Sequence, residues 1–289
     1  MMAVDRRQAW LLLTLLFLLT VSATALTGCG GDVDAKPSAT VASGATTPPV
    51  EGEVVVFAAS SLTDAFKEAA RKFREGNPNA RVTFNFASSS ALSTQINEGA
   101  SADVFASADL AQMRVVTDKG SAADPVIFAT NLPTLVVPKS GSPVATFADL
   151  AKPGIRLVLA GPEVPVGKYS REIFANASKA GSGVSADFSG KALANLKSNE
   201  ANVRAVLTKV QLGEADAGVV YTTDASTALN EVKLVEIPAQ YNVIAQYPAA
   251  TLKGAKNAAA AKAWVAFILG ADGQGVLTKF GFGKPARQN

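Results

Sequence analysis

The hydrophobic and polar positions of this chain predict strands that lead directly into helices. Residues 54–57 read V-V-V-F, a β-branched and aromatic run typical of a buried strand. Beyond Ser60 and Ser61, apolar side chains recur at spacings of three and four from Leu62 to Phe73, which predicts one buried helix face. The two serines therefore stand at a helix N-terminus, where free backbone N–H groups and the positive end of the helix dipole favour an anion.

The same pattern returns along the chain. Residues 81–86 alternate as a strand and lead through Ser88, Ser89 and Ser90 into a second helix. Further strands are predicted at 102–106, 156–160 and 218–221, and each is followed by a helix or helix start. Strands that alternate with helices predict parallel sheets with right-handed crossovers. Ligands of such sheets lie beyond the carboxyl ends of the strands, where both serine clusters fall.

The remaining segments complete an α/β pattern. We expect strands or extended segments at 126–129, 135–138, 232–237 and 245–252, and helices at 203–212, 258–269 and 274–280. A short helix capped by Thr146 is predicted at 146–150. The stretch 179–191 is rich in Gly, Ser and Ala and is predicted to be a surface loop.

The first 28 residues are typical of a lipoprotein signal peptide. Arg6 and Arg7 precede an apolar core at 10–21 that is too short for a comfortable membrane span. The core leads to L-T-G-C, which resembles the lipobox of bacterial lipoproteins, so Cys29 is the predicted lipidation site. Residues 29–50 then read as a flexible tether. We therefore expect a lipid-anchored protein on the extracytoplasmic face of the cell membrane; the role of Arg6 and Arg7 in the export route stays open.

Composition and motif spacing remove several function classes. The 289 residues are 48% hydrophobic with a net charge of +3, enough for two domains and without the basic block expected of a nucleic-acid partner. The absence of His removes His-dependent catalysis, and the single Cys and lack of a ligand cluster argue against a free metal cation. Five residues separate Gly161 from Gly167, and Tyr169 follows Lys168, so the spacing and the missing hydroxyl exclude a P-loop.

Six sequence blocks together carry a family resemblance. They are F-A-A-S-S-L-T-D-A at 57–65, F-A-S-S-S-A-L-S-T-Q-I at 86–96, G-A-S-A-D-V-F-A-S-A-D at 99–109, G-P-E-V-P-V-G-K-Y at 161–169, N-V-R-A-V-L at 202–207 and G-V-V-Y-T-T-D-A at 218–225. In this order they resemble the molybdate-binding proteins of bacterial ABC importers, which are type II periplasmic binding proteins.

The resemblance implies a two-lobed α/β fold. Each lobe would hold a mainly parallel sheet flanked by helices, and two hinge crossings near 131–138 and 245–252 would join them. Lobe one would comprise 53–131 plus 247–289, and lobe two 132–246.

The resemblance also implies the ligand groups. Ser61 and Ser89 match hydroxyl ligands, Val166 and Val203 match backbone N–H donors, and Tyr221 matches a phenol donor. The implied function is capture of molybdate, and of tungstate, for the membrane permease of an ABC importer. No cofactor is expected, and the sequence favours a monomer.

These inferred donors are all neutral, which suits one class of ligand. Molybdate, tungstate and sulfate are fully deprotonated dianions at neutral pH and accept hydrogen bonds at every oxygen. Hydrogen phosphate carries a proton that a donor-only cage leaves unpaired, at a cost of roughly 1–3 kcal/mol. Asp64 is interpreted as a first-turn helix acid rather than as an acceptor for that proton. Sulfate or another tetrahedral oxyanion remains the alternative ligand.

Two other function classes fit less well. A hydrolase with Ser60 or Ser61 as nucleophile needs a base; Lys67 falls on a different helix face and no S-x-x-K motif is present. A structural or adhesion lipoprotein has no need of three anion-ready junctions. We therefore expect a binding protein and not an enzyme.

Overall fold

The computed structural model describes residues 50–181 and 183–285. The predicted signal peptide, Cys29 and all but the last residue of the predicted tether lie outside the described residues. Within the described part of the chain, no helix is both long enough and apolar enough to span a membrane.

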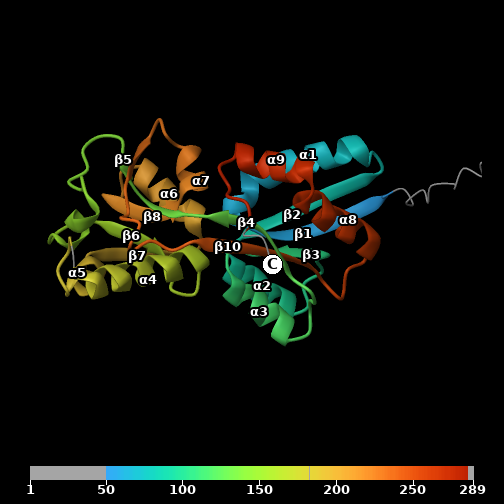
Figure 1. Ribbon diagram of the computed structural model, residues 1–289, viewed down its shortest axis with the longest axis horizontal. Helices are drawn as coiled ribbons and strands as arrows, with labels where there is room; N and C mark the ends of the chain where they lie inside the picture. The colour runs from blue at the N-terminus through green and yellow to red at the C-terminus, as the bar shows by residue number, and fades with distance from the viewer. Residues whose placement is uncertain (1–49, 182, 286–289) are drawn as a thin grey trace, which may run out of the picture. The chain divides into compact units, whose positions relative to one another are not determined.

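Lobe one is built on a five-stranded sheet in the order β2-β1-β3-β10-β4. The strands are β1 (Gly52–Ala59), β2 (Ala80–Ala87), β3 (Val104–Ala106), β4 (Val126–Asn131) and β10 (Ala245–Thr251). A 3-10 turn η1 (Ser60–Leu62), α1 (Thr63–Gly76), α2 (Ser89–Asn97), α3 (Leu110–Asp118), α8 (Ala258–Leu269) and α9 (Ala271–Lys279) complete the lobe. Helices α1, α8 and α9 cover one face of the sheet and α2 and α3 the other (Figure 1).

Lobe two repeats this arrangement with the order β7-β6-β8-β5-β9. Its strands are β5 (Pro133–Pro138), β6 (Leu157–Ala160), β7 (Leu196–Glu200), β8 (Ala217–Tyr221) and β9 (Val232–Val235). Its helices are η2 (Phe147–Ala151), α4 (Pro165–Ala180), α5 (Phe188–Ala194), α6 (Val203–Gln211) and α7 (Thr222–Ser226).

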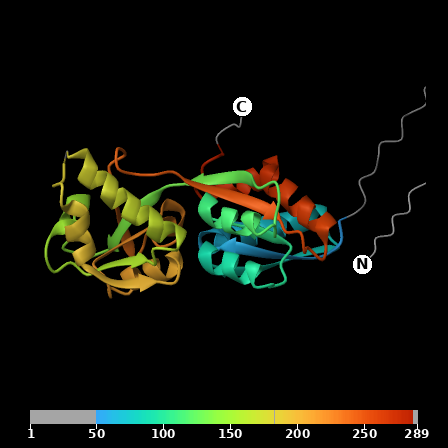
Figure 2. The ribbon, with the colours of Figure 1, turned by 90° about the horizontal axis from the view of Figure 1, so that it is seen from below.

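Each sheet holds a single antiparallel strand, and in each case it is the strand that arrives from the other lobe. β5 runs antiparallel to β8 and β9, and β10 runs antiparallel to β3 and β4, whereas the other neighbouring pairs are parallel. The two crossings lie side by side, because Asn131 at the end of β4 pairs with Ala245 at the start of β10 (Figure 2). The predicted fold class, two mainly parallel sheets flanked by helices, is confirmed.

The cores explain why these segments fold as they do. In lobe one, Trp264 of α8 packs edge-on against Phe66 and Phe73 of α1, with ring centroids 5.5 Å apart in both pairs. In lobe two, the ring of Phe147 lies 4.8 Å from Phe188 and 5.9 Å from Phe174. Aromatic contacts therefore join α1 to α8 in lobe one, and η2 to α4 and α5 in lobe two.

One sequence expectation for lobe two was wrong, and one strand of this lobe was not predicted. The predicted surface loop at 179–191 spans much less, because α4 continues to Ala180 and α5 begins at Phe188, which is 1% exposed. Strand β7, L-K-S-N-E, was not predicted. It is an edge strand paired only with β6, and its side chains are half-buried or exposed, so it lacks the apolar run that marks a central strand.

Candidate functional site

A small cavity between the lobes brings together all five predicted site residues. Ser61 and Ser89 line it from lobe one, and Val166, Val203 and Tyr221 line it from lobe two. The other lining residues are Ala59, Ser60, Ala87, Ser88, Ala108, Val164 and Pro165. Its volume of about 10 Å³ corresponds to about one ordered water, so the cavity is too small for an organic substrate.

The lobe-one side presents two buried hydroxyls at the carboxyl ends of β1 and β2. Ser88 caps α2 and accepts a hydrogen bond from the Ala91 amide at 3.3 Å, which places Ser89 in the first turn. The Ala108 amide donates to Ser89 Oγ at 2.9 Å. This bond occupies an acceptor lone pair of Ser89 and leaves its own proton for the cavity.

The lobe-two side presents backbone amides. Val166 is the second residue of α4, after Pro165, and Val203 is the first residue of α6, after the cap Asn202. At these positions an α-helix provides no intrahelical acceptor for the N–H group. Both side chains are buried, so these amides belong to a site largely shielded from water.

Gly167 explains how the Val166 amide reaches this position. A Cβ atom at residue 167 would overlap the carbonyl oxygens of Gly161 and Ala160. The close approach of α4 to the end of β6 therefore requires glycine at this position.

Tyr221, the last residue of β8, supplies the fifth group. It is 1% exposed, and its Oη has no hydrogen-bond partner among the described residues. Burial raises the pKa of the Tyr221 phenol well above its usual value, so the group keeps its proton. A buried hydroxyl that lines a cavity without a protein partner is a donor available to a ligand.

The electrostatics of the cavity favour an anion. Helices α2, α4 and α6 begin at its wall, and α1 follows the η1 turn that carries Ser61, so the positive ends of their dipoles are directed toward it. No charged side chain is among the twelve described residues that line it. The arrangement can bind an anion through neutral donors alone.

An ion-pair network joins the lobes beside the cavity. Arg204, next to Val203, contacts Asp224 of α7 at 2.5 Å and Asp64 of α1 at 2.7 Å. Asp224 is fully buried, and this burial raises its pKa to about 6 despite the opposing effect of the guanidinium. Asp64 does lie in the first turn of α1, and it also serves as a partner across the lobes.

A second contact between the lobes involves the segment before α4. Gln112 Nε2 of α3 donates to the carbonyl oxygen of Glu163 at 3.2 Å, and Ser93 Oγ donates to Gln112 Oε1 at 2.7 Å. Glu163 immediately precedes the cavity residue Val164, so both lobes contribute contacts that hold the cavity closed.

Several groups around the site were not predicted. Ser60 and Ser88 line the cavity, and their only sequence signal is their place in the serine clusters. Tyr247 of β10 contacts Ser61, with 2.9 Å between the two hydroxyl oxygens, and Asn131 of β4 contacts Tyr247. Both fall within or next to the predicted crossings, but no motif distinguishes them from ordinary strand residues.

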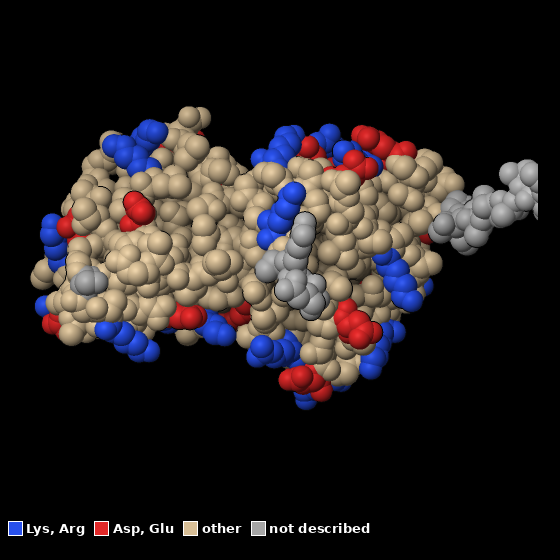
Figure 3. Space-filling model, viewed as in Figure 1, with Lys and Arg blue, Asp and Glu red and all other residues tan. Residues whose placement is uncertain are grey.

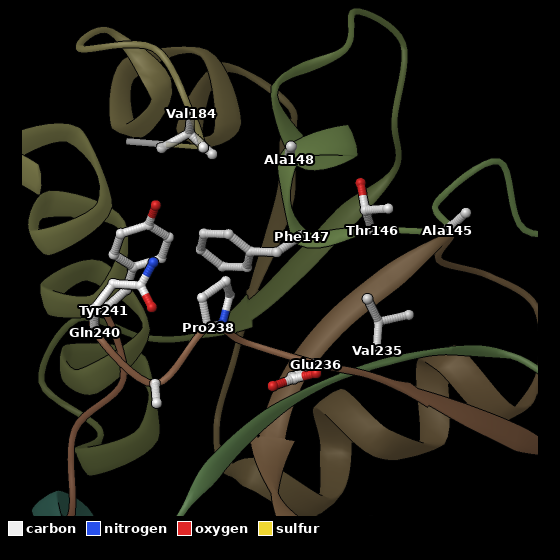
Figure 4. Close-up of a pocket in the computed structure, with 12 residues that line it drawn as sticks. Ala145, Thr146, Phe147, Ala148, Val184, Val235, Glu236, Pro238, Gln240 and Tyr241 are labelled. Carbon is white, nitrogen blue, oxygen red and sulfur yellow. The ribbon is translucent and has the colours of Figure 1, made fainter. Parts of the chain in front are cut away.

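A larger cavity of about 680 Å³ lies within lobe two (Figure 4). It contains Phe147, Val235, Pro238 and Tyr241, with the Glu236 carboxylate at its edge, and none of the five predicted residues line it. A mostly apolar lining with a carboxylate does not suit a dianion, so the small cavity is the better candidate.

The face of the molecule shown in Figure 3 gives no further candidate for a charged ligand. On the face in Figure 3, basic and acidic side chains are interspersed around the edge of each lobe rather than gathered in one patch. Within residues 50–181 and 183–285, no group of three or more His, Cys, Asp or Glu side chains is placed to hold a metal ion.

Comparisons with known proteins agree with this geometry. Residues 54–283 match the family described as bacterial extracellular solute-binding protein. The molybdate-binding protein ModA of Mycobacterium tuberculosis is 40% identical over 263 residues, which cover 90% of this chain and 93% of the relative. Among solved structures, the periplasmic molybdate-binding protein of Azotobacter vinelandii superposes with a TM-score of 0.68 at 20% identity, covering 81% of this chain and all of that one. The sulfate-binding protein SubI of Mycobacterium tuberculosis gives 0.72 at 18% identity, covering 80% and 86%.

Proposed function

This chain belongs to the family of bacterial extracellular solute-binding proteins, and we propose that it captures molybdate in the cavity between its lobes for delivery to the membrane permease of an ABC importer. The bound ion would contact Ser61 and Ser89 on one side and the Val166 amide, the Val203 amide and Tyr221 on the other. Contacts from both lobes favour the closed arrangement when the ion is bound.

The proposal rests on the hydrogen bonds that the Ser89 and Tyr221 hydroxyls make, and do not make, within the protein. Ser89 already accepts from the Ala108 amide, and Tyr221 Oη has no partner within the described residues. Their protons are thus available to a ligand that accepts at every oxygen. A fully deprotonated dianion satisfies them, whereas hydrogen phosphate would leave its own proton unpaired.

Tungstate has the same charge and shape as molybdate and belongs to the same proposal. Sulfate, or another tetrahedral oxyanion, is the alternative ligand, and the fold likeness to a sulfate-binding protein is as high as that to a molybdate-binding one. The 40% identity to a molybdate-binding relative favours molybdate.

The cellular setting we propose follows from the first 50 residues. A lipid at Cys29 would anchor the chain at the extracytoplasmic face of the cell membrane, and the tether would let a monomeric binding domain reach the permease. We propose no enzymatic activity, because Ser61 faces Tyr247 rather than a base and the chain has no His.

Thermal unfolding of the purified chain with molybdate, tungstate, sulfate and phosphate tests this function. A ligand at 100 times its Kd adds about 2.7 kcal/mol of stability, which raises Tm by several degrees. Increases with molybdate and tungstate alone are the expected result. An increase in Tm with sulfate alone would show that sulfate, the alternative ligand, is the one bound. No increase in Tm with any oxyanion would refute oxyanion capture.

A further inference from the structure

A hydrogen-bond chain connects the hinge crossings to Ser61. Tyr247 Oη lies 2.9 Å from Ser61 Oγ, and Asn131 Nδ2 donates to Tyr247 Oη at the longer distance of 3.4 Å. All three residues are at least 97% buried, and they come from β10, η1 and β4. The chain therefore joins a cavity residue to both strands that connect the lobes.

The orientation of the Asn131 amide is fixed by its other contacts. The Leu132 amide donates to Asn131 Oδ1 at 2.9 Å, which identifies that atom as the oxygen, and Thr222 Oγ1 also contacts it at 3.1 Å. The Nδ2 group donates to Thr223 Oγ1 at 2.8 Å, so the NH₂ side faces Thr223 and Tyr247. The backbone N–H of Leu132 cannot accept, so the amide cannot be reversed without losing this bond.

This orientation determines where the phenol proton of Tyr247 goes. Asn131 Nδ2 is a donor only, so Tyr247 Oη accepts from it. Tyr247 is fully buried, and the acceptor within reach of its own proton among the described residues is Ser61 Oγ. Leaving a buried donor unpaired is costly, so Tyr247 donates to Ser61. The serine hydroxyl then has its acceptor side occupied and its proton free.

We propose that Tyr247, held by Asn131, is a positioning residue that fixes the Ser61 hydroxyl as a donor to the cavity and thereby discriminates against protonated oxyanions. Ser89 is fixed in the same sense by the Ala108 amide, but that donor is backbone. Tyr247 does not itself line the cavity, so a change of its side chain can alter the polarity of the cavity without altering its lining. The inference rests on the proposed capture of a dianion.

The test compares two ligands at pH 8, where molybdate has no proton and phosphate is mainly the dianion with one proton. Tyr247→Phe keeps the ring and removes the hydroxyl, so Ser61 can either donate or accept. We expect the ratio of molybdate affinity to phosphate affinity, measured by calorimetry on the full chain, to fall about tenfold. If Tyr247 has a purely structural role, Tyr247→Phe should lower the affinities for molybdate and phosphate equally. The ratio would then be unchanged, which would overturn the proposal.

Two controls isolate the route through Ser61. Tyr241→Phe removes another buried phenol hydroxyl in lobe two, outside the small cavity, and should leave the ratio as in the unmodified chain. In a Ser61→Ala background, Tyr247→Phe should no longer change the ratio, because the group it positions is gone. A full effect of Tyr247→Phe in that background would contradict the proposal.

A second variant tests the chain from its other end, should Tyr247→Phe fail to fold. Asn131→Asp places a carboxylate where the Leu132 amide and the Thr222 hydroxyl already donate, so the charge is well hydrogen-bonded. The phenol then donates to residue 131 and Ser61 donates to the phenol. The molybdate-to-phosphate ratio should again fall, and an unchanged ratio would overturn the inference. If the unmodified chain binds neither anion, the proposed function itself fails, which the other outcomes do not imply.

Discussion

The two walls of the cavity supply the same kind of group by different means. Lobe one provides the hydroxyls of Ser61 and Ser89, which other protein donors hold in place. Lobe two provides the amides of Val166 and Val203, which helix geometry leaves free, together with the phenol of Tyr221. A donor built from backbone survives almost any side-chain change, whereas a donor built from a hydroxyl can be removed by one substitution. This difference between backbone and hydroxyl donors predicts which substitutions weaken ligand binding and which destabilise the fold.

The largest effect is expected where the two walls are joined, at Arg204. Arg204→Gln leaves the fully buried Asp224 carboxylate without its cation, which costs about 3–5 kcal/mol. In the unmodified chain the pKa of Asp224 is raised to about 6, so the folded state binds its proton more tightly than the unfolded state. This carboxyl therefore favours folding below about pH 4 and loses that contribution as the pH rises to about 6.

Denaturant unfolding of Arg204→Gln at pH 5 and pH 8 checks this prediction. Without the cation the pKa of Asp224 rises further, so the deficit relative to the unmodified chain should shrink at pH 5. The double variant with Asp224→Asn should recover stability at pH 8. An equal deficit at both pH values would contradict the assignment to Asp224.

The next effect concerns the lobe-two backbone. In Gly167→Ala the new methyl group meets the carbonyl oxygens of Gly161 and Ala160, so α4 must move away from β6. Overpacking of this kind costs about 1–3 kcal/mol, and the shift misplaces the Val166 amide. We expect lower Tm and weaker molybdate binding together. Gly190→Ala, which meets no neighbouring atom within 4 Å, is the matched control and should change neither by much.

The hydroxyl donors of the two walls should differ in a way that separates binding from folding. Ser89→Ala and Tyr221→Phe each remove one hydrogen bond to a dianion, worth about 1.5–3 kcal/mol, so each should weaken molybdate binding roughly 10- to 100-fold. Ser89→Ala also leaves the buried Ala108 amide unpaired and should lower the stability of the ligand-free chain. Tyr221→Phe removes a hydroxyl that has no partner among the described residues, so it should not lower the stability of the ligand-free chain. Calorimetry and ligand-free unfolding distinguish the two, and equal losses of stability would remove this difference between the walls.

The smallest effect on affinity is expected at Val203. Val203→Ala keeps the backbone N–H, so the affinity for molybdate should stay within about twofold even though loss of two buried methyl groups costs roughly 2 kcal/mol of stability. A tenfold loss of affinity would show that the side chain, and not the amide, makes the contact.

Local patterns predicted the strand–helix junctions and their gathering at one edge of each sheet. The serine clusters end buried strands and begin helices, and the carboxyl ends of parallel strands gather at one edge, so the place of both clusters follows from periodicity and topology. The choice of Ser61 and Ser89 within the clusters came from the family resemblance. The family resemblance, rather than any periodicity, pointed to Val166, Val203 and Tyr221.

Other features could not be predicted because they depend on contacts distant in sequence. Ser61 and Tyr247 are 186 residues apart, and Arg204 and Asp64 are 140 apart. Strand β7 escaped detection because an edge strand needs no apolar run, and α5 because one buried aromatic, Phe188, lies in a Gly- and Ser-rich stretch. Pairings of this kind become visible only when the sheets have assembled.

The direction of β1 determines where this protein can be immobilised or fused without obstructing the cavity. The strand runs from Gly52 to Ala59, and only its far end borders the cavity. The seven steps between Gly52 and Ala59, at about 3.3 Å each, separate those two ends by roughly 23 Å. A sensor chip, a bead or a fluorescent fusion partner coupled just ahead of residue 50 would therefore stand at the opposite end of β1 from the cavity. Immobilisation through the N-terminus is accordingly the orientation in which an oxyanion biosensor made from this chain should keep its response.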